Sequence, residues 1–387
     1  MPEPDTGPRQ ADTPAAGAQR PAGPADPAKP GATHSRRGFG GRSPQTAGPE
    51  AHTTGVQGAE PSEQHPLLRL ADLRVTLTAP TGRETALVDG VSFDVPPAAT
   101  TGLIGESGSG KTMTALAVIG LLPEHASATG RVEWRGEDLL HATPARRRRT
   151  RGHEIAMIFQ DPLAALNPTQ RIGRQVGEIL RRDGLPRAEV RRRTVELLDR
   201  AGVPEPERRA SNYPHEFSGG LRQRAMIALA LAGNPSLLLA DEPTTALDVT
   251  VQARILRLLR SIQQAEGLAM LLVSHDLRVV ANVAEQVVVL YAGRVAERGP
   301  ARAVLRRAAH PYTRALVRSV PAVRTRAALA DPIPGTPATP ANRPPGCAFH
   351  PRCPLARDRC RTEVPAVREV APERFSACHY AEEVLDP

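Results

Sequence analysis

The spacing of apolar residues along the chain changes period several times, and each period predicts a different kind of element. Apolar and polar residues alternate around positions 73, 75 and 77, and again around 91, 93 and 95. A period of two buries one face of a strand, and the turn Pro80-Thr81-Gly82 separates the two runs. We therefore expect a small antiparallel β-layer, with a further short strand at 130–134.

Beyond this layer, short continuous apolar runs alternate with stretches of helical period. The apolar runs occupy 103–104, 155–159, 237–240, 269–273 and 287–291, and helical spacing occupies 113–122, 172–201, 225–232 and 251–262. Continuous apolar strands are typical of a parallel sheet that is covered on both faces. Strands alternating with helices indicate crossover connections. The pattern therefore predicts an α/β fold with a parallel-sheet core and an antiparallel β subdomain.

The first 66 residues differ from the rest of the chain in composition. They are rich in Pro, Gly, Ala and Thr, and Phe39 is their only aromatic residue. Such a segment buries too little apolar surface to offset its ordering entropy, so we predict a disordered leader over 1–66. No apolar run approaches the ~18 residues that span a bilayer, and no signal-like apolar core is present. We expect a protein of the cytoplasm or of the inner membrane face.

A glycine-rich stretch carries the strongest chemical signal. The stretch is Gly105-Glu106-Ser107-Gly108-Ser109-Gly110-Lys111-Thr112, and it matches the phosphate-binding pattern G-x-x-x-x-G-K-[ST] at every position. It connects the end of an apolar strand to the start of a helix, whose N-terminus suits an anion. The chain is rich in arginine and has only two lysines, Lys29 and Lys111. A lysine at the required position is therefore unlikely to be accidental. Lys111 is expected on the outer phosphates and Thr112 on Mg²⁺.

Two carboxylates follow the apolar run at 237–240. Asp241 would complete a Mg²⁺ site with Thr112, and Glu242 would polarise a water in line with the terminal phosphate as a general base. Alone, such a pair is most often a strand cap. Together with the phosphate loop, it predicts nucleotide hydrolysis.

A second glycine-containing turn enters a helix at Ser218-Gly219-Gly220-Leu221-Arg222-Gln223. Its backbone N–H groups and helix dipole suit a phosphate for the same reason as in the first loop. Two phosphate-binding turns with one acidic strand end suggest that two copies share each nucleotide.

These motifs together resemble those of the ATP-binding cassette (ABC) ATPases. The resemblance runs from about 67 to 309 and includes the phosphate loop, Gln160, the 218–223 turn, the sequence 237–243, Asp248 and His275. Several further segments resemble the ATPases of dipeptide, oligopeptide and nickel importers. They are 158–162, 213–216, 241–250, His310-Pro311-Tyr312-Thr313 and the tail around 346–353. The resemblance implies a RecA-like core, an α-helical signature subdomain at about 161–225, and a small cysteine-containing C-terminal extension over 310–387.

The resemblance also implies roles for single residues. Gln160 would sense Mg²⁺ and couple to membrane subunits. Ser218, Gly219 and Gly220 would contact the γ-phosphate of ATP held by a second ATPase subunit. Gln223 is expected among the ATP-binding residues of the same turn. Asp248 would communicate across that interface, and His275 would contact the γ-phosphate. The implied cofactors are ATP and Mg²⁺.

The implied assembly is an importer. The chain would bind two transmembrane permease subunits and a second ATPase subunit, identical or paralogous, at the cytoplasmic face of the membrane. An extracytoplasmic solute-binding protein would deliver a dipeptide or oligopeptide; nickel or another small solute is the alternative cargo. The net charge of +9 also suits a soluble ABC ATPase acting on nucleic acid or ribosomes. Such proteins usually carry two cassettes or long coiled-coil insertions, and neither is found, so no nucleic-acid partner is expected. A non-catalytic cassette is disfavoured because Lys111, Asp241, Glu242 and His275 are all in place.

Three positions depart from the family pattern. Phe217 replaces the usual Leu before the signature turn, which should be tolerated. Ala98-Ala99 replaces the usual Gly-Glu before the phosphate-loop strand, so that turn is expected to be less well formed. Leu77 replaces the aromatic residue that often stacks on adenine, which would cost ~1–3 kcal/mol of stacking.

The four cysteines all lie in the tail, at Cys347, Cys353, Cys360 and Cys378. A cytoplasmic location argues against stable disulfides, and the neighbouring arginines are expected to lower the thiol pKa values. The spacings exceed the ~2–4 residues common between zinc-binding cysteines. Iron–sulfur ligation tolerates varied loops and also resembles what some members of this importer group carry. We therefore favour a [4Fe–4S] cluster over zinc, with four free thiols as the remaining alternative.

Overall fold

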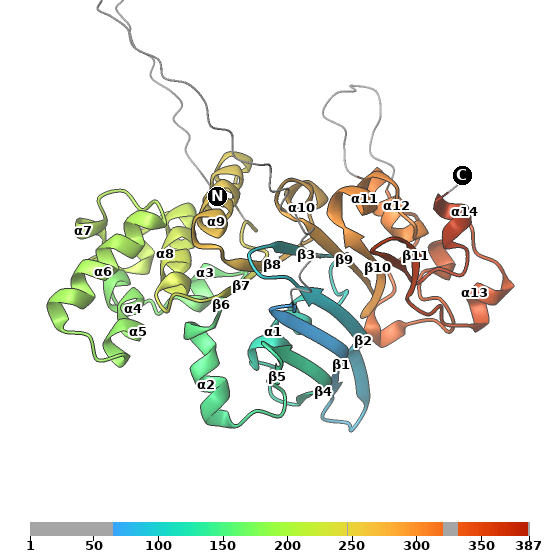
Figure 1. Ribbon diagram of the computed structural model, residues 1–387, viewed down its shortest axis with the longest axis horizontal. Helices are drawn as coiled ribbons and strands as arrows, with labels where there is room; N and C mark the ends of the chain where they lie inside the picture. The colour runs from blue at the N-terminus through green and yellow to red at the C-terminus, as the bar shows by residue number, and fades with distance from the viewer. Residues whose placement is uncertain (1–64, 246, 320–331, 386–387) are drawn as a thin grey trace, which may run out of the picture. The chain divides into compact units, whose positions relative to one another are not determined.

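The computed structural model describes residues 65–385, apart from 246 and 320–331. Two sheets, one of four strands and one of eight, organise these residues. Figure 1 labels all of their strands except β12. The predicted disorder of the 1–66 leader falls almost entirely outside the described residues.

The four-stranded sheet is the predicted antiparallel layer. It contains β1 (Leu68–Thr78), β2 (Glu84–Val95), β4 (Ala126–Trp134) and β5 (Glu137–Asp138), in the order β2-β1-β4-β5. Its inward side chains are fully buried, among them Leu73, Val75 and Trp134. The alternating pattern therefore indicated the correct buried face. Leu77 lies on β1, opposite Thr85 and Ala126.

The eight-stranded sheet has a parallel half and an antiparallel half. The parallel strands are β9 (Gln286–Tyr291), β3 (Thr100–Ile104), β8 (Ala269–Ser274), β7 (Leu237–Asp241) and β6 (Ile155–Ile158), side by side in that order. They correspond to the five predicted apolar runs. On the other side of β9, the antiparallel strands β10 (Arg294–Pro300), β12 (Arg374–Ser376) and β11 (Arg368–Ala371) extend the sheet. The sequence analysis did not predict these three strands.

The helix after the phosphate loop is shorter than predicted. Helix α1 is Lys111–Ile119, whereas helical spacing continues to Leu122. The helix ends because Gly120 adopts a left-handed conformation with φ of 67°, and its N–H bonds back to carbonyls of the last turn. Leu121 and Leu122 therefore lie in the following loop.

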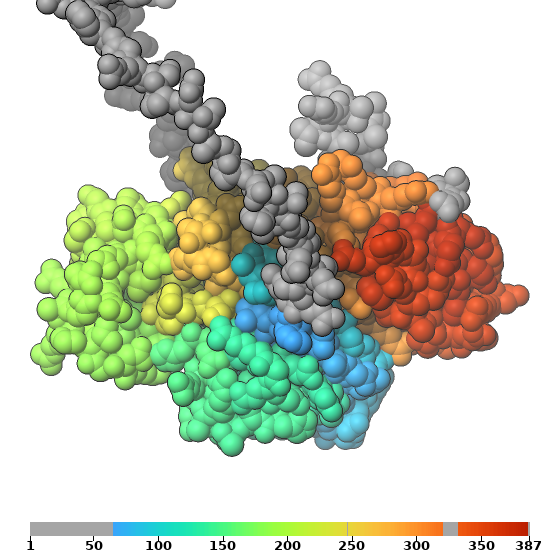
Figure 2. Space-filling view, in the orientation of Figure 1, coloured from blue at the N-terminus to red at the C-terminus, as the bar shows by residue number. Residues whose placement is uncertain are grey.

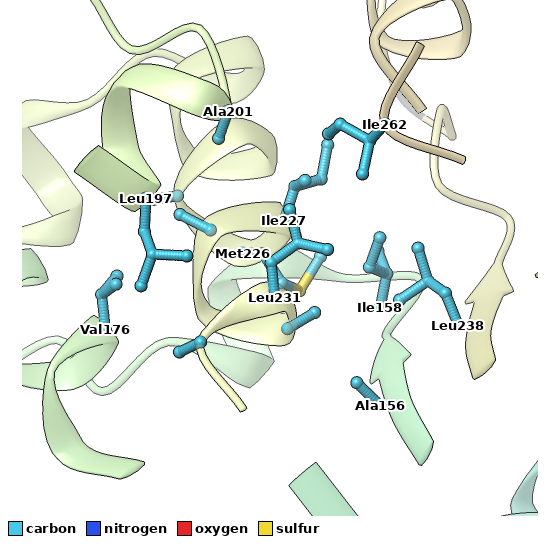
Figure 3. Close-up of a cluster of buried hydrophobic side chains, with 14 of the residues drawn as sticks. Ala156, Ile158, Val176, Leu197, Ala201, Met226, Ile227, Leu231, Leu238 and Ile262 are labelled. Carbon is cyan, nitrogen blue, oxygen red and sulfur yellow. The ribbon is translucent and has the colours of Figure 1, made fainter. Parts of the chain in front are cut away.

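The helical subdomain and the parallel strands share one hydrophobic core. The subdomain contains α3 (Pro162–Ala165), α4 (Ile172–Val176), α5 (Glu178–Arg182), α6 (Arg187–Arg200), α7 (Pro206–Arg209) and α8 (Gly219–Leu231). Figure 3 shows Met226, Ile227 and Leu231 of α8 between Leu197 of α6 and the strand residues Ile158 and Leu238. The core also includes Phe217, which is 2% exposed, so the Leu-to-Phe change is accommodated. This shared core fixes the position of α8 relative to the ends of β6 and β7.

Three further helices connect the strands. Helix α2 (Pro144–His153) carries the basic run 146–149 and precedes β6. Helix α9 (Val249–Glu266) connects β7 to β8, and α10 (Leu277–Val283) connects β8 to β9. These connections between parallel strands are the crossovers that the pattern predicted.

The C-terminal residues are built onto the antiparallel edge. They include α11 (Ala301–Arg306), α12 (Pro311–Arg318), the 3-10 turns η2 (Pro340–Asn342) and η3 (His350–Arg352), α13 (Asp358–Thr362) and α14 (Ala381–Leu385). Their core is an aromatic cluster in which Phe349 lies 5.3 Å from Tyr291 and 5.4 Å from Tyr312, measured between ring centroids. Figure 2 shows the residues after 331, in red, as one surface continuous with the orange residues of α11 and α12.

The turn before β3 is formed, but with a strained residue. Ala98 has φ of 52°, in the left-handed region that favours glycine. Its carbonyl accepts a hydrogen bond of 2.8 Å from Gln263 Nε2, and that of Ala99 accepts one of 2.9 Å from Met270 N. The expectation of a less well-formed turn was therefore wrong about the hydrogen bonds. The departure from Gly instead leaves a strained backbone.

This strain leads to a stability prediction. Ala98→Gly should raise the free energy of unfolding by about 0.5–1 kcal/mol, because relief of the left-handed strain exceeds the added entropy of the unfolded chain. Ala99→Gly is the matched control. Ala99 does not have a positive φ, so that change should only destabilise. Urea unfolding of both variants measures the difference, and equal losses of stability would contradict the prediction.

Candidate functional site

The glycine-rich loop lies between β3 and α1, and its glycines are required by close contacts. A Cβ atom on Gly105 would lie 2.3 Å from the carbonyl oxygen of Leu290, and one on Gly110 would lie 2.9 Å from that of Leu87. Gly108 has φ of 76°, and a Cβ there would meet no atom within 4 Å. The loop is therefore held between neighbouring backbones and open at Gly108.

The polar groups of this loop fit an anion. Lys111 is 5% exposed, and its Nζ donates to the carbonyl oxygens of Gly105 at 2.8 Å and Glu106 at 2.9 Å. Burial lowers the pKa of Lys111, although Glu242 and Asp241 oppose that shift. Ser109 Oγ is buried without a hydrogen-bond partner in the described structure. A folded-back lysine, an unsatisfied hydroxyl and a helix N-terminus suit the phosphates of a nucleotide.

Thr112 and Asp241 meet at the start of α1. Thr112 Oγ1 lies 3.3 Å from Asp241 Oδ1, and Asp241, the last residue of β7, is 2% exposed. Burial raises the pKa of Asp241, and the Thr112 hydrogen bond acts against that shift. Oxygen ligands of this kind fit Mg²⁺, which would neutralise charge on the nucleotide phosphates.

Glu242 lies at the centre of the predicted catalytic residues. Its Oε1 lies 3.0 Å from His275 Nδ1, and its Oε2 accepts a hydrogen bond of 3.0 Å from Gln160 Nε2. Thr245 Oγ1 donates to the same Oε2 at 2.9 Å. Sequence reasoning missed Thr245; its position three residues after Glu242, within one turn, was the available signal.

The strand order explains this convergence. Glu242 and His275 directly follow β7 and β8, and Gln160 lies two residues beyond the end of β6. These three strands are neighbours in the parallel sheet. The carboxyl ends of parallel strands share one edge, where ligands bind in α/β folds.

The pKa and the backbone conformation of Glu242 both depart from their ordinary values. Burial raises the pKa of Glu242, but the hydrogen bonds from His275 and Thr245 and the charge of Lys111 outweigh it, so the pKa lies below its usual value. Its φ of 45° is in the left-handed region, where strain in a non-glycine residue often marks a functional site. An ionised carboxylate is the state that a general base requires.

The second glycine turn is formed but is separate from these contacts. Ser218 caps α8 and its Oγ accepts a hydrogen bond of 3.4 Å from Leu221 N, while Asp248 caps α9 through Val251 N at 2.9 Å. A Cβ on Gly220 would lie 2.9 Å from Val251 Cγ1. No hydrogen bond or ion pair joins 218–223 to the phosphate loop within the described part of the chain.

The residues of the second turn differ in exposure. Ser218 and Gly219 are exposed. Gln223 is 3% exposed, with Nε2 unpaired among described atoms. Its burial does not fit the direct contact with nucleotide that the sequence suggested.

The four cysteines line one small cavity, together with residues such as His310, Phe349 and Tyr380. Burial raises the pKa values of the Cys347, Cys353 and Cys378 thiols to about 11. The prediction that nearby arginines lower the thiol pKa values was therefore wrong for these three, because burial is the larger effect. Among the described residues, no group of three or more His, Cys, Asp or Glu side chains is placed to hold a metal ion. The arrangement does not support the predicted [4Fe–4S] cluster.

Within the described ranges, no helix combines the length and apolarity that crossing a membrane requires.

A phosphate loop between β3 and α1, the Thr112–Asp241 pair, and Glu242 directly after β7 define a nucleotide-hydrolysing protein of the P-loop class. The family model described as ABC transporter matches residues 88–245, and that described as oligopeptide/dipeptide transporter, C-terminal region, matches 296–360. The chain belongs to the ATP-binding proteins of ABC transporters, in the group that carries this C-terminal region.

Curated relatives support the same family assignment. The dipeptide transport ATP-binding protein DppD of Escherichia coli is 45% identical over 296 residues, which cover 76% of this chain and 90% of DppD. The oligopeptide transport ATP-binding protein OppD of Salmonella typhimurium is 42% identical, over 84% of this chain and 96% of OppD. Among solved structures, the dimeric cassette MJ0796 bound to ADP and Pi has a TM-score of 0.55 and 26% identity, covering 61% of this chain and 99% of that one.

Proposed function

We propose that this ABC ATPase powers the import of dipeptides or oligopeptides, with its catalytic centre at the shared edge of β6, β7 and β8. The observation that carries the proposal is the convergence of Gln160 and His275 on Glu242, next to the Thr112–Asp241 pair. DppD and OppD, named for dipeptide and oligopeptide transport, support the cargo class.

We assign the roles as follows. The backbone of 105–112 and Lys111 would hold the ATP phosphates, and Thr112, Asp241 and Gln160 would hold Mg²⁺, which neutralises charge on those phosphates when bound. Glu242 accepts a proton from the attacking water. Its bonds to Gln160, His275 and Thr245 orient the carboxylate before the water arrives, and His275, whose side chain is 60% exposed, can turn toward the γ-phosphate.

The second half of each catalytic site comes from another ATPase subunit. The exposed Ser218 and Gly219, with Gly220, would bind the γ-phosphate held by that partner, and Asp248 would lie at the same interface. The dimeric state named for the MJ0796 structure supports this arrangement. We leave Gln223 out of the contact set because it is buried.

The complete assembly has two permease subunits, to which this chain binds at the cytoplasmic face of the membrane. An extracytoplasmic solute-binding protein delivers the cargo. The test is uptake in proteoliposomes that contain the complex with ATP inside. Peptide uptake supports the proposal. Uptake of nickel alone would transfer it to the metal importers, and ATPase activity stimulated only by nucleic acid would replace it with the soluble class.

The cysteine-lined cavity has its own test. The [4Fe–4S] hypothesis concerns the four cysteines that line this one cavity. If a cluster forms, protein purified without oxygen will be brown, absorb near ~400 nm and contain about four iron atoms per chain. One zinc per chain would assign the site to zinc, and metal-free protein with four titratable thiols would reject both metals.

A further inference from the structure

The C-terminal extension reaches the phosphate loop through a buried arginine. Arg352, the last residue of η3, donates from Nη1 to Glu106 Oε2 at 2.7 Å and from Nη2 to Glu106 Oε1 at 3.1 Å. The side chain of Arg352 is 3% exposed and that of Glu106 is 23% exposed. A two-point contact between a planar guanidinium and a carboxylate fixes direction as well as distance.

Arg352 is itself held in place. Its Nε donates to the carbonyl oxygen of Pro334 at 2.9 Å, and its Nη2 donates to that of Ile333 at 3.3 Å. Its guanidinium also lies 5.8 Å from the ring centroid of Phe349. The arginine therefore has little freedom to follow Glu106 if the loop moves.

Glu106 connects this arginine to the proposed ATP-binding lysine. Its carbonyl oxygen accepts from Lys111 Nζ at 2.9 Å, and its backbone N–H donates to Tyr312 Oη at 2.9 Å. Tyr312 is fully buried against Phe349. Both the side chain and the backbone of Glu106 are thus anchored on C-terminal residues.

A second arginine, Arg343, is linked to the other end of the loop through two intervening residues, Asp89 and Gly293. Arg343 Nη1 donates to Asp89 Oδ2 at 2.7 Å, and the N–H of Asp89 donates to the carbonyl oxygen of Gly293 at 2.8 Å. The N–H of Gly293 then donates to the carbonyl oxygen of Ser109 at 3.0 Å. Arg294 also pairs with Asp89, at 2.7 Å, so this second connection is shared.

We infer that the segment 333–352 is a strap that holds the phosphate loop in its nucleotide-binding shape, with Arg352 as the positioning residue and Glu106 as its contact. Three glycines make 105–112 conformationally free, so an unrestrained loop would lose entropy when phosphate binds. A loop that is already ordered binds more tightly for the same contacts. The inference rests on the proposed role of this loop in ATP binding.

The test compares full-length variants by equilibrium binding of Mg·ATP and by steady-state hydrolysis. Arg352→Gln should raise the ATP Kd and KM about tenfold, in the range of typical coupling between sites, while kcat changes less than about twofold because the groups around Glu242 are untouched. Arg352→Lys keeps the charge but not the two-point contact, and should recover part of the affinity. Arg357→Gln is the matched control, since Arg357 pairs with Glu383 at an exposed site of the same extension.

A double-mutant cycle separates positioning from general damage. If Arg352 acts through Glu106, the Glu106→Gln, Arg352→Gln double variant should bind ATP no more weakly than the weaker single variant. Additive losses would overturn the inference, as would an unchanged Kd in folded Arg352→Gln. If Arg352→Gln does not fold, the same Kd criterion applies to Glu106→Gln alone. Lys111→Ala distinguishes the two proposals: unchanged ATP binding in that variant would overturn the loop assignment itself, whereas its loss beside an unchanged Arg352→Gln overturns only the strap.

Discussion

Glu242→Gln protein is expected to bind ATP about as tightly as the wild type and to hydrolyse it about 10²–10⁴-fold more slowly. The amide keeps the size of the side chain, and its oxygen can replace Oε2 in accepting the hydrogen bonds from Gln160 and Thr245. Its NH2 group then faces Nδ1 of His275, which a neutral imidazole can offer as an acceptor. It cannot accept a proton from the attacking water, so the loss should appear in kcat and not in ATP affinity. Single-turnover hydrolysis and equilibrium ATP binding measure the two effects separately.

The control for this variant is Glu196→Gln, on the exposed face of α6, where Glu196 pairs with Arg192. It should leave both quantities unchanged, because the side chain is 51% exposed and far from the strand ends in sequence. Near wild-type turnover by Glu242→Gln would remove Glu242 from the role of base. Loss of ATP binding in that variant would instead assign it to the binding of nucleotide.

Lys111→Ala and Ser218→Arg chains should each be nearly inactive alone and should regain activity when mixed. If two copies share each nucleotide, a mixed dimer contains one site with an intact Lys111 and an intact Ser218, supplied by different chains. The other site carries both substitutions. The recovery therefore depends on subunit exchange, and ATPase activity of co-purified mixed complexes measures it.

The mixing experiment needs a control that separates complementation from simple dilution. Each variant mixed with itself at the same total concentration should remain inactive. Full activity of either single variant would dismiss the shared site. If the native partner is a paralogous ATPase, the two substitutions are placed in the two different chains, and the same comparison applies.

The amino-acid sequence was sufficient wherever the chemistry is local. The phosphate loop is contiguous, and its glycines, Lys111 and Thr112 are needed in one order at one spacing, so the pattern alone located it. Asp241 and Glu242 could be read in the same way, since a buried apolar run placed them at a strand end. The alternation of β1 and β2 also determined which side chains face the core, because a strand has only two faces.

The meeting of residues that are distant in the sequence could be anticipated only by resemblance, and two expectations taken from local sequence were wrong. That Gln160, Glu242 and His275 meet depends on the order β8-β7-β6, and strand order is a property of the whole sheet. The termination of α1 at Gly120 depended on a backbone conformation that helical spacing does not report. The raised thiol pKa values reflect burial, whereas the sequence showed only neighbouring arginines.

The tertiary structure alone decided how the C-terminal extension joins the ATPase. Strands β11 and β12 are short and weakly apolar, and they form because β10 offers a free edge and because Arg374 pairs at 3.1 Å with the fully buried Glu297. Arg352 is one of many arginines in the chain, and nothing local distinguishes it. Its role is defined only when folding brings it next to Glu106, 246 positions away in the sequence. Exclusion of water there strengthens the ion pair between the two side chains.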